Sequence, residues 1–170
     1  MYMLIYNEKL HNIIQTVTSK AVLILDRFTE ERKKVLDALR VELRKKDLIP
    51  IIFDFENPST KNITETVSTI AKLARFVIAD ITDAKSIPQE LREIVPGNPS
   101  LPIQPIILST QYEYSMFKDF MDYPWVLKPY RYDNLIMLLE SLDEHVITPA
   151  IGKAEEIQER RDAFDKEMQE

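Results

Sequence analysis

The sequence predicts an α/β protein, with a five-stranded parallel sheet between two layers of helices. Short apolar runs alternate with amphipathic segments five times along the chain, and this alternation is typical of strands joined by crossover helices. The first run, Ala21–Asp26, is apolar up to its last residue, as expected of a strand that is buried on both faces. The length of 170 residues and the hydrophobic content of 45% suit one domain with a sizeable core.

Each element is placed by its apolar spacing and by the residues that cap it. The five strands are expected at Ala21–Asp26, Ile49–Phe55, Arg75–Asp80, Pro105–Leu108 and Trp125–Leu127. Helices need a side chain that accepts a hydrogen bond from their first turn, and Ser, Thr, Asp and Asn serve best. The helices between the strands are therefore expected after Thr29 and Asn62, from Ser86 to about Val95, from Tyr112 to Asp122, and after Asp133.

Helical extensions are expected at both ends of a domain that spans residues 21–148. Residues 149–170 form a charged helix with a thin apolar stripe. Residues 1–20 form a helix that we expect to pack on the domain, in preference to docking on another protomer. Its stripe consists of Leu10, Ile13, Ile14 and Val17.

The composition excludes several classes of function. The chain has no Cys and two His residues, which argues against a thiol nucleophile, a disulfide scaffold, a zinc site and a Ser-His-Asp triad. Its two Gly residues permit neither a dinucleotide-binding fingerprint nor a phosphate-binding loop. A net charge of −6 without a basic face makes nucleic acid a poor partner. We expect no metal, no cofactor, no membrane span and a cytoplasmic location.

The candidate active site follows the third strand, because open α/β sheets bind ligands at the carboxyl ends of central strands. Asp80 ends that strand, and Asp26 ends its expected neighbour. Glu90 lies about one turn into the next helix, at the edge of its apolar face. An ionised carboxylate at a cleft can attack a sugar carbon or stabilise an oxocarbenium-like cation. The alternative is that Glu90 is a solvated helix acid and that the two Asp residues only cap loops.

Several segments, taken in their order along the chain, resemble those of a known protein family. They are the first strand with its Asp-containing loop, the second strand with a polar loop, the run from Ile70 to Asp80, and Gln89-Glu90-Leu91. From Ala21 to Glu144 the chain resembles a TIR (Toll/interleukin-1 receptor) domain, of the TIR-like and nucleoside-deoxyribosyltransferase-like group. It departs from that pattern in having no glycine in the polar loop and no Ser-x-Trp-Cys before the Glu.

The resemblance implies a flavodoxin-like three-layer sandwich that cleaves the N-glycosidic bond of NAD or a related nucleotide. Glu90 is then the catalytic carboxylate, and a role as an effector in bacterial defence is implied as well. The substrate contacts are expected to be Asp26, Arg27, Phe28 and Asp80.

Two other functions stay open. One is a non-catalytic module that forms homo-oligomers through TIR-like surfaces. The other is a degenerate receiver domain, since response-regulator receivers share this topology and use acids, a Ser/Thr and a Lys-Pro pair at strand ends. The matching residues here are Asp26, Asp80, Ser109 and Lys128-Pro129. A receiver needs a second acid beside Asp26, where this chain has Arg27.

Overall fold

The computed structural model describes residues 2–26, 29–54, 63–82, 89–112 and 115–168. Within these ranges the side chains of residues 2–7, 53–54, 63–66, 89–90, 93 and 115–116 lie outside the description. The sequence-based expectations about Arg27, Phe28, Asn62 and Ser86 fall on residues outside it.

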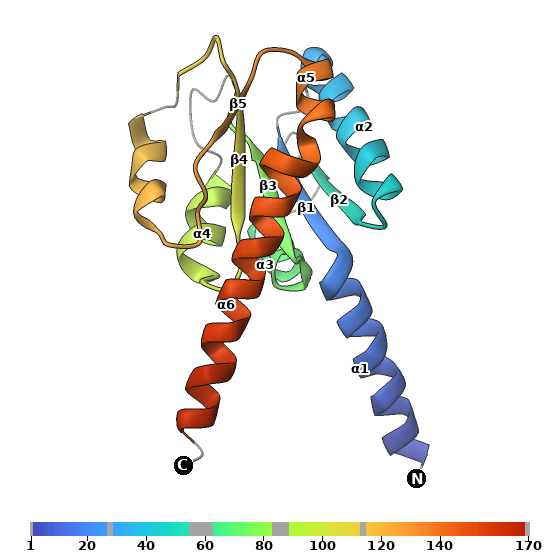
Figure 1. Ribbon diagram of the computed structural model, residues 1–170. Coiled ribbons are helices and arrows are strands. Elements are labelled where there is room, and N and C mark those ends of the chain that lie inside the picture. Colours follow the sequence, from blue (N-terminus) through green and yellow to red (C-terminus); the bar gives the residue numbers. More distant parts are fainter. Residues whose placement is uncertain (1, 27–28, 55–62, 83–88, 113–114, 169–170) are drawn as a thin grey trace.

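The fold is a five-stranded parallel sheet with helices on both faces, so the predicted flavodoxin-like α/β architecture is confirmed (Figure 1). The strand order is β2-β1-β3-β4-β5. The chain thus moves outward from β1 to β2 and then crosses back to β3, which creates a topological switch point between β1 and β3. The strands are β1 Ala21–Asp26, β2 Ile49–Asp54, β3 Phe76–Asp80, β4 Ile103–Leu108 and β5 Tyr130–Tyr132.

The helices form two layers because side chains of each strand point alternately to the two faces of the sheet. The odd-numbered residues of β1 and β3, such as Leu23 and Val77, pack with α3, α4 and the 3₁₀ helix η1. The even-numbered residues, such as Ile24 and Ile78, pack with α2, α5, the π-helical turn η2 and the start of α6. The helices are α1 Tyr2–Lys20, α2 Glu30–Lys45, α3 Ile63–Leu73, α4 Gln89–Gly97, η1 Ser115–Asp122, α5 Leu135–Glu140, η2 Asp143–Ile147 and α6 Thr148–Glu167.

The start of α2 agrees with its sequence signals. Thr29 caps the helix, and its Oγ1 accepts a hydrogen bond from the backbone N–H of Arg32 at 3.3 Å. Glu30 and Glu31 lie in the first turn and Arg44 and Lys45 in the last, so charges of the favourable sign lie at both ends of the helix dipole. This capped end is what fixes the direction in which the first turn of α2 presents its side chains to the sheet.

The fifth strand lies later in the chain than the sequence suggested. Trp125–Leu127 was expected to be that strand, but Val126 makes only an isolated bridge with Ile103, and β5 is Tyr130–Tyr132. The backbone N–H of Ile103 donates to the carbonyl of Trp125, and that of Leu127 donates back to Ile103, each at 2.9 Å. The chain therefore meets the start of β4 briefly and pairs properly with it only after Pro129.

The cap of α5 also differs from the expectation by one residue. Asn134, not Asp133, caps the helix, and its Oδ1 accepts a hydrogen bond from the backbone N–H of Met137 at 2.9 Å. The Asp133 carboxylate instead accepts a hydrogen bond from Ser109 Oγ, beyond the end of β4. Either residue type can cap a helix, so this competing partner decides between the two.

The expectation that residues 1–20 pack on the domain was wrong. Helix α1 runs away from the sheet, and α6 extends in a similar direction and diverges from it (Figure 1). Only the beginning of α6 belongs to the core, where Ala150 is buried and Ile151 packs against the same cluster. In the part of the chain that the structure describes, no helix is long and apolar enough to cross a membrane.

Candidate functional site

Two buried aspartates lie side by side at the switch point. Leu25 of β1 pairs with Ala79 of β3, so Asp26 and Asp80 end the two neighbouring strands. Both residues are buried. Their positions continue the even-numbered face of the sheet, which α2 and α5 cover, so these carboxylates need polar partners from that layer.

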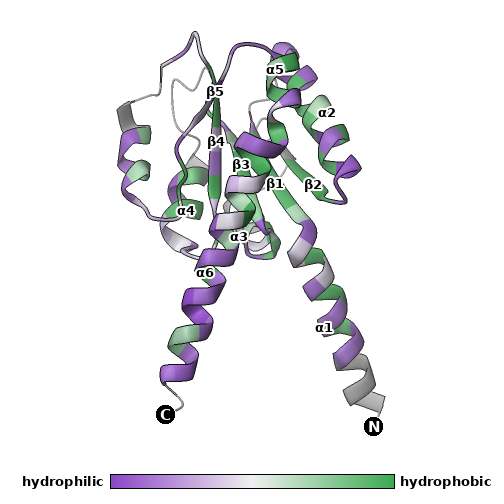
Figure 2. Ribbon diagram, in the orientation of Figure 1, coloured by the Kyte–Doolittle hydropathy of each residue, from purple (hydrophilic) through white to green (hydrophobic). Residues whose placement is uncertain are grey.

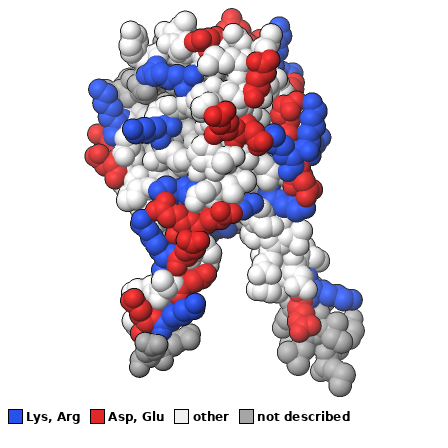
Figure 3. All heavy atoms as spheres, in the orientation of Figure 1, with Lys and Arg blue, Asp and Glu red and all other residues white. Residues whose placement is uncertain are grey.

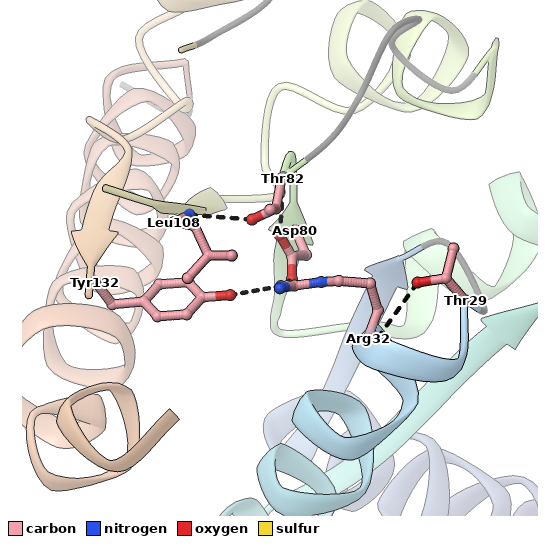
Figure 4. A network of polar contacts seen from close by, with 6 residues as sticks. All are labelled: Thr29, Arg32, Asp80, Thr82, Leu108 and Tyr132. Carbon is pink, nitrogen blue, oxygen red and sulfur yellow. Dashed lines mark hydrogen bonds and ion pairs between the residues drawn. The ribbon is translucent and has the colours of Figure 1, made fainter. Parts of the chain in front are cut away.

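Helix α2 supplies the partner of Asp80. Arg32 lies in its first turn, and its guanidinium forms an ion pair with the Asp80 carboxylate (Figure 4). The side chains are only 9% and 1% exposed, respectively. The same guanidinium donates a hydrogen bond to the hydroxyl of Tyr132 in β5. Arg32 therefore connects a helix to two strands that are not adjacent in the sheet.

The other carboxylate oxygen of Asp80 is held by the loop after β3. The backbone N–H of Thr82 donates to Asp80 Oδ1 at 2.9 Å. Thr82 Oγ1 in turn accepts a hydrogen bond from the backbone N–H of Leu108 at 3.1 Å (Figure 4). These bonds fix the rotamer of Asp80 and hold the carboxyl ends of β3 and β4 together at this edge of the sheet.

The ion pair has an electrostatic cost as well as a benefit. Taking two charges out of water is repaid only when their geometry and additional hydrogen bonds are good, and both groups here have such bonds. Arg32 Nε is buried, and among the described residues it has no hydrogen-bond partner. A buried N–H without an acceptor costs about 1–3 kcal/mol, so a ligand oxygen that reached it would be favoured.

The structure describes the side chains of only some of the predicted site residues. It brings Asp26 and Asp80 together, as the sequence suggested. Glu90 lies in the first turn of α4, but its side chain is outside the described residues, as are Arg27 and Phe28. Their roles as catalytic and substrate-binding groups stay predictions.

Sequence reasoning missed Arg32 and Tyr132. A signal was present for Arg32, because it continues the apolar stripe of α2 toward the helix N-terminus. A charged residue at a core position of an amphipathic helix indicates a buried partner. The buried residues of α2 are Arg32, Val35, Leu36, Leu39 and Leu43.

The residues matched to a receiver domain are arranged differently from a phosphoacceptor site. Asp80 is sequestered by Arg32, and so its carboxylate is not presented to a phosphodonor. Ser109 Oγ is bonded to Asp133, while Lys128 is exposed. Among the described residues, no group of three His, Cys, Asp or Glu side chains could hold a metal ion. The pairing of Asp80 with Arg32 therefore disfavours a phosphorylation switch at Asp80.

The strand order and the polar cluster define a flavodoxin-like α/β protein whose buried charged groups, among the described residues, lie at the switch point. The solved structures that share the fold include two with TM-scores above 0.5. One is the CMP N-glycosidase BcmB of Clostridium botulinum, with a TM-score of 0.57 and 17% identity over 73% of this chain and 98% of that one. The other is a diflavin flavoprotein A3 from Nostoc sp., with a TM-score of 0.53 and 9% identity over 85% and 96%.

At these identities the likeness shows the fold alone. It supports a fold related to that of a nucleotide N-glycosidase, which is broader than the TIR domain suggested by the sequence. No protein-family model matches the chain, and no curated protein matches it in sequence.

Proposed function

We propose that this protein is a nucleotide N-glycosidase whose catalytic carboxylate is Glu90. The observation that carries the proposal is the buried polar cluster at the switch point, on a fold shared with a CMP N-glycosidase. There Asp26 and Asp80 end neighbouring strands and Arg32 pairs with Asp80. Ligands of open α/β sheets bind at this edge. Glu90 stands in the first turn of α4, the helix that follows β3 in the chain.

The reaction breaks the bond between C1′ of the sugar and a nitrogen of the base. The bonding electron pair leaves with the base, and C1′ becomes cationic. Cytosine takes up a proton as it leaves, which matches the proton that the attacking water gives up, whereas nicotinamide leaves as the neutral base and the proton of the water is released to solvent. The Glu90 carboxylate adds to C1′ or stabilises its charge, and water then supplies the hydroxyl that C1′ carries in the product. Asp26, Arg27, Phe28 and Asp80 are the proposed substrate contacts, and a sugar hydroxyl that reached Asp80 would compete with Arg32 for its carboxylate.

Two nucleotides should be tested first as substrates in a panel of nucleotides. CMP comes first because the structurally similar enzyme is a CMP N-glycosidase. NAD comes second because TIR-like enzymes cleave it, and an effector role in bacterial defence belongs to that same resemblance. No cofactor takes part in either reaction.

The test is chromatographic detection of the free base, cytosine or nicotinamide, after incubation with CMP or NAD. Glu90→Gln keeps the shape of the side chain and removes its charge, so it is expected to abolish release. Glu93→Gln makes the same change elsewhere in α4 and should leave release unaffected. Equal release by wild type and Glu90→Gln, or no release from any nucleotide in the panel, would contradict the proposal.

The second candidate function is a non-catalytic module that self-associates. The specific observation in its favour is the exposed apolar stripe of α1, which includes Leu10, Ile13 and Ile14. This function predicts oligomers whose formation is indifferent to Glu90→Gln. The two candidates are compatible with each other, since the stripe and the strand ends lie at opposite edges of the sheet (Figure 1).

A further inference from the structure

Helix α1 carries an apolar face that the described part of its own chain leaves uncovered. Leu10, Ile13 and Ile14 are 45%, 60% and 45% exposed, and Val17 continues the face toward the domain. Their spacing of i, i+3, i+4 and i+7 is the anchor pattern of a helix that lies in an apolar groove. Figure 2 shows these hydrophobic patches along α1.

The composition of α1 argues that it needs such a groove. Ile13, Ile14 and Val17 are β-branched and favour helix weakly, and most of the stability of a helix in a protein comes from packing of its apolar face. Three hydroxyls on α1 donate hydrogen bonds to carbonyls of the same helix, from Thr16 to Asn12 at 2.8 Å, from Thr18 to Ile14 at 2.9 Å and from Ser19 to Thr16 at 2.8 Å. Such bonds do not add helix stability, so packing has to supply it.

The chain also presents a groove of suitable character. It has a volume of about 690 Å³ and lies between α6 and the segments that flank β4. Trp125, Ile157 and Phe164 contribute apolar surface to its lining. The Trp125 indole N–H is already bonded to the carbonyl of Val95 at 2.8 Å, so the ring offers its apolar body and demands no polar partner.

The α1 helix of the same chain is held away from this groove. Arg75 donates to the carbonyl of Ser19 at 3.2 Å and forms an ion pair with Glu155 of α6 at 3.6 Å. The base of α1 therefore meets the side of α6 that carries Glu155. At about 100° per residue, Ile157 and Phe164 lie roughly 160° and 180° away from Glu155 around the helix. The groove thus opens on the opposite side of α6.

We propose that α1 of one copy docks in the α6 groove of a second copy, and that the exchange is reciprocal in a two-fold dimer. A helix about 10 Å wide, followed over about 20 Å and half covered, hides roughly 300 Å² of its surface. Two such helix–groove contacts bury on the order of 1,200 Å² in total, the lower limit for a specific interface. A single contact would not reach this limit, which favours the reciprocal arrangement.

The charges of the two surfaces are compatible with this docking. Glu156 of the groove pairs with Lys153 at 2.7 Å and with Arg160 at 2.6 Å, so these charges compensate one another within α6. In Figure 3, α1 is nearly free of charge between the domain and its far end, where Glu8 and Lys9 offer one charge of each sign. Arg161 and Asp165 also line the groove, so its charged side chains, three basic and two acidic, leave a net charge of +1. Docking of the uncharged part of α1 therefore brings no surfaces of strong like charge together.

Directed cross-linking tests the pairing, since the chain contains no cysteine. An Ile13→Cys protein is mixed with a Phe164→Cys protein and treated with a short bismaleimide. We expect a cross-linked heterodimer in the mixture. Asn12→Cys is the matched control, because Asn12 lies on the opposite face of α1, and its yield should be about tenfold lower. Cross-linking of Ile13→Cys with itself at equal or higher yield would overturn the proposal in favour of paired α1 helices.

Sedimentation equilibrium supplies the second measurement. Ile13→Glu in α1 and Trp125→Ala in the groove should each weaken the dimer by about a hundredfold, as loss of a buried anchor does. Circular dichroism checks that the domain stays folded. A wild-type monomer at high concentration, or a dimer that only the α1 variant dissociates, would overturn the proposal. Flotation of a monomeric wild type with phosphatidylcholine–phosphatidylserine vesicles would overturn it as well, and would assign the stripe to a membrane surface.

Discussion

Arg32 of α2 and Asp80 of β3 form a buried ion pair that joins the helix layer to the centre of the sheet. The pair lies at the switch point, where the buried charged groups of the described residues, Asp26, Arg32 and Asp80, are found. Because both partners also have hydrogen bonds, from Tyr132 and from the loop after β3, the pair is part of a network and not an isolated contact. Mutation of each partner can measure what it contributes to the free energy of unfolding.

Removal of one partner should be strongly destabilising. Arg32→Met leaves the Asp80 carboxylate buried without its cation, and we expect a loss of about 3–5 kcal/mol in the free energy of unfolding. Urea denaturation followed by circular dichroism measures it. Arg40→Met, on the exposed side of the same helix, is the matched control and should change stability by less than about 0.5 kcal/mol.

The double variant Arg32→Met/Asp80→Leu separates charge from packing. Because it removes both buried charges, it should recover most of the stability lost by Arg32→Met alone. A double variant that is as unstable as the sum of the two single variants would show that the residues are not energetically coupled.

Tyr132→Phe should cost less than the loss of Arg32. The substitution keeps the buried ring and removes only the hydroxyl that accepts a hydrogen bond from Arg32. We expect a loss of about 1.5–3 kcal/mol, the range for hydrogen bonds to charged groups. Tyr112→Phe, at an exposed position, is the control and should be neutral. An effect of Tyr132→Phe no larger than that of Tyr112→Phe would contradict the importance of this bond.

Mutation can distinguish Asn134 from Asp133 as the residue that caps α5. Asn134→Ala removes the acceptor for the backbone N–H of Met137 and should cost about 1 kcal/mol. Asp133→Ala removes only an exposed hydrogen bond with Ser109 and should cost less. Thermal unfolding of the two variants side by side distinguishes them, and the reverse ranking would restore Asp133 as the cap.

The layered fold could be predicted because its signals are local. Ala21–Asp26 and Phe76–Asp80 are short, almost wholly apolar runs, and the structure buries every residue of both strands. The helix after Thr29 had a cap, charges at both ends and an apolar stripe. These signals depend on neighbouring residues along the chain, so one sequence is enough to read them.

The missed features depend on distant partners. Whether Tyr130–Tyr132 or Trp125–Leu127 pairs with β4 depends on register, which both short segments satisfy equally well in sequence. The ion pair joins residues 48 positions apart in the chain, and its hydrogen bond to Tyr132 spans 100. Asp26 and Asp80 were identified only because strand ends meet at one edge of a parallel sheet.

The ion pairs of Glu156 with Lys153 and Arg160 on α6 should contribute less to stability as the pH falls. A hydrogen bond from Lys153, the charge of Lys153 and then the charge of Arg160 hold the pKa of Glu156 below its ordinary value of 4.5. A carboxyl whose pKa is depressed in the folded state stabilises that state above its unfolded pKa, and the contribution disappears as pH falls through the folded pKa.

Glu156→Gln should therefore lower stability slightly near neutral pH, and the difference from wild type should vanish under acidic conditions. The effect is small because the pair is solvent-exposed. Carboxyl chemical shifts followed by NMR give the pKa directly, and Lys153→Met should move it back toward 4.5. A Glu156 pKa that does not rise in that variant would show that Lys153 is not the main cause of the shift.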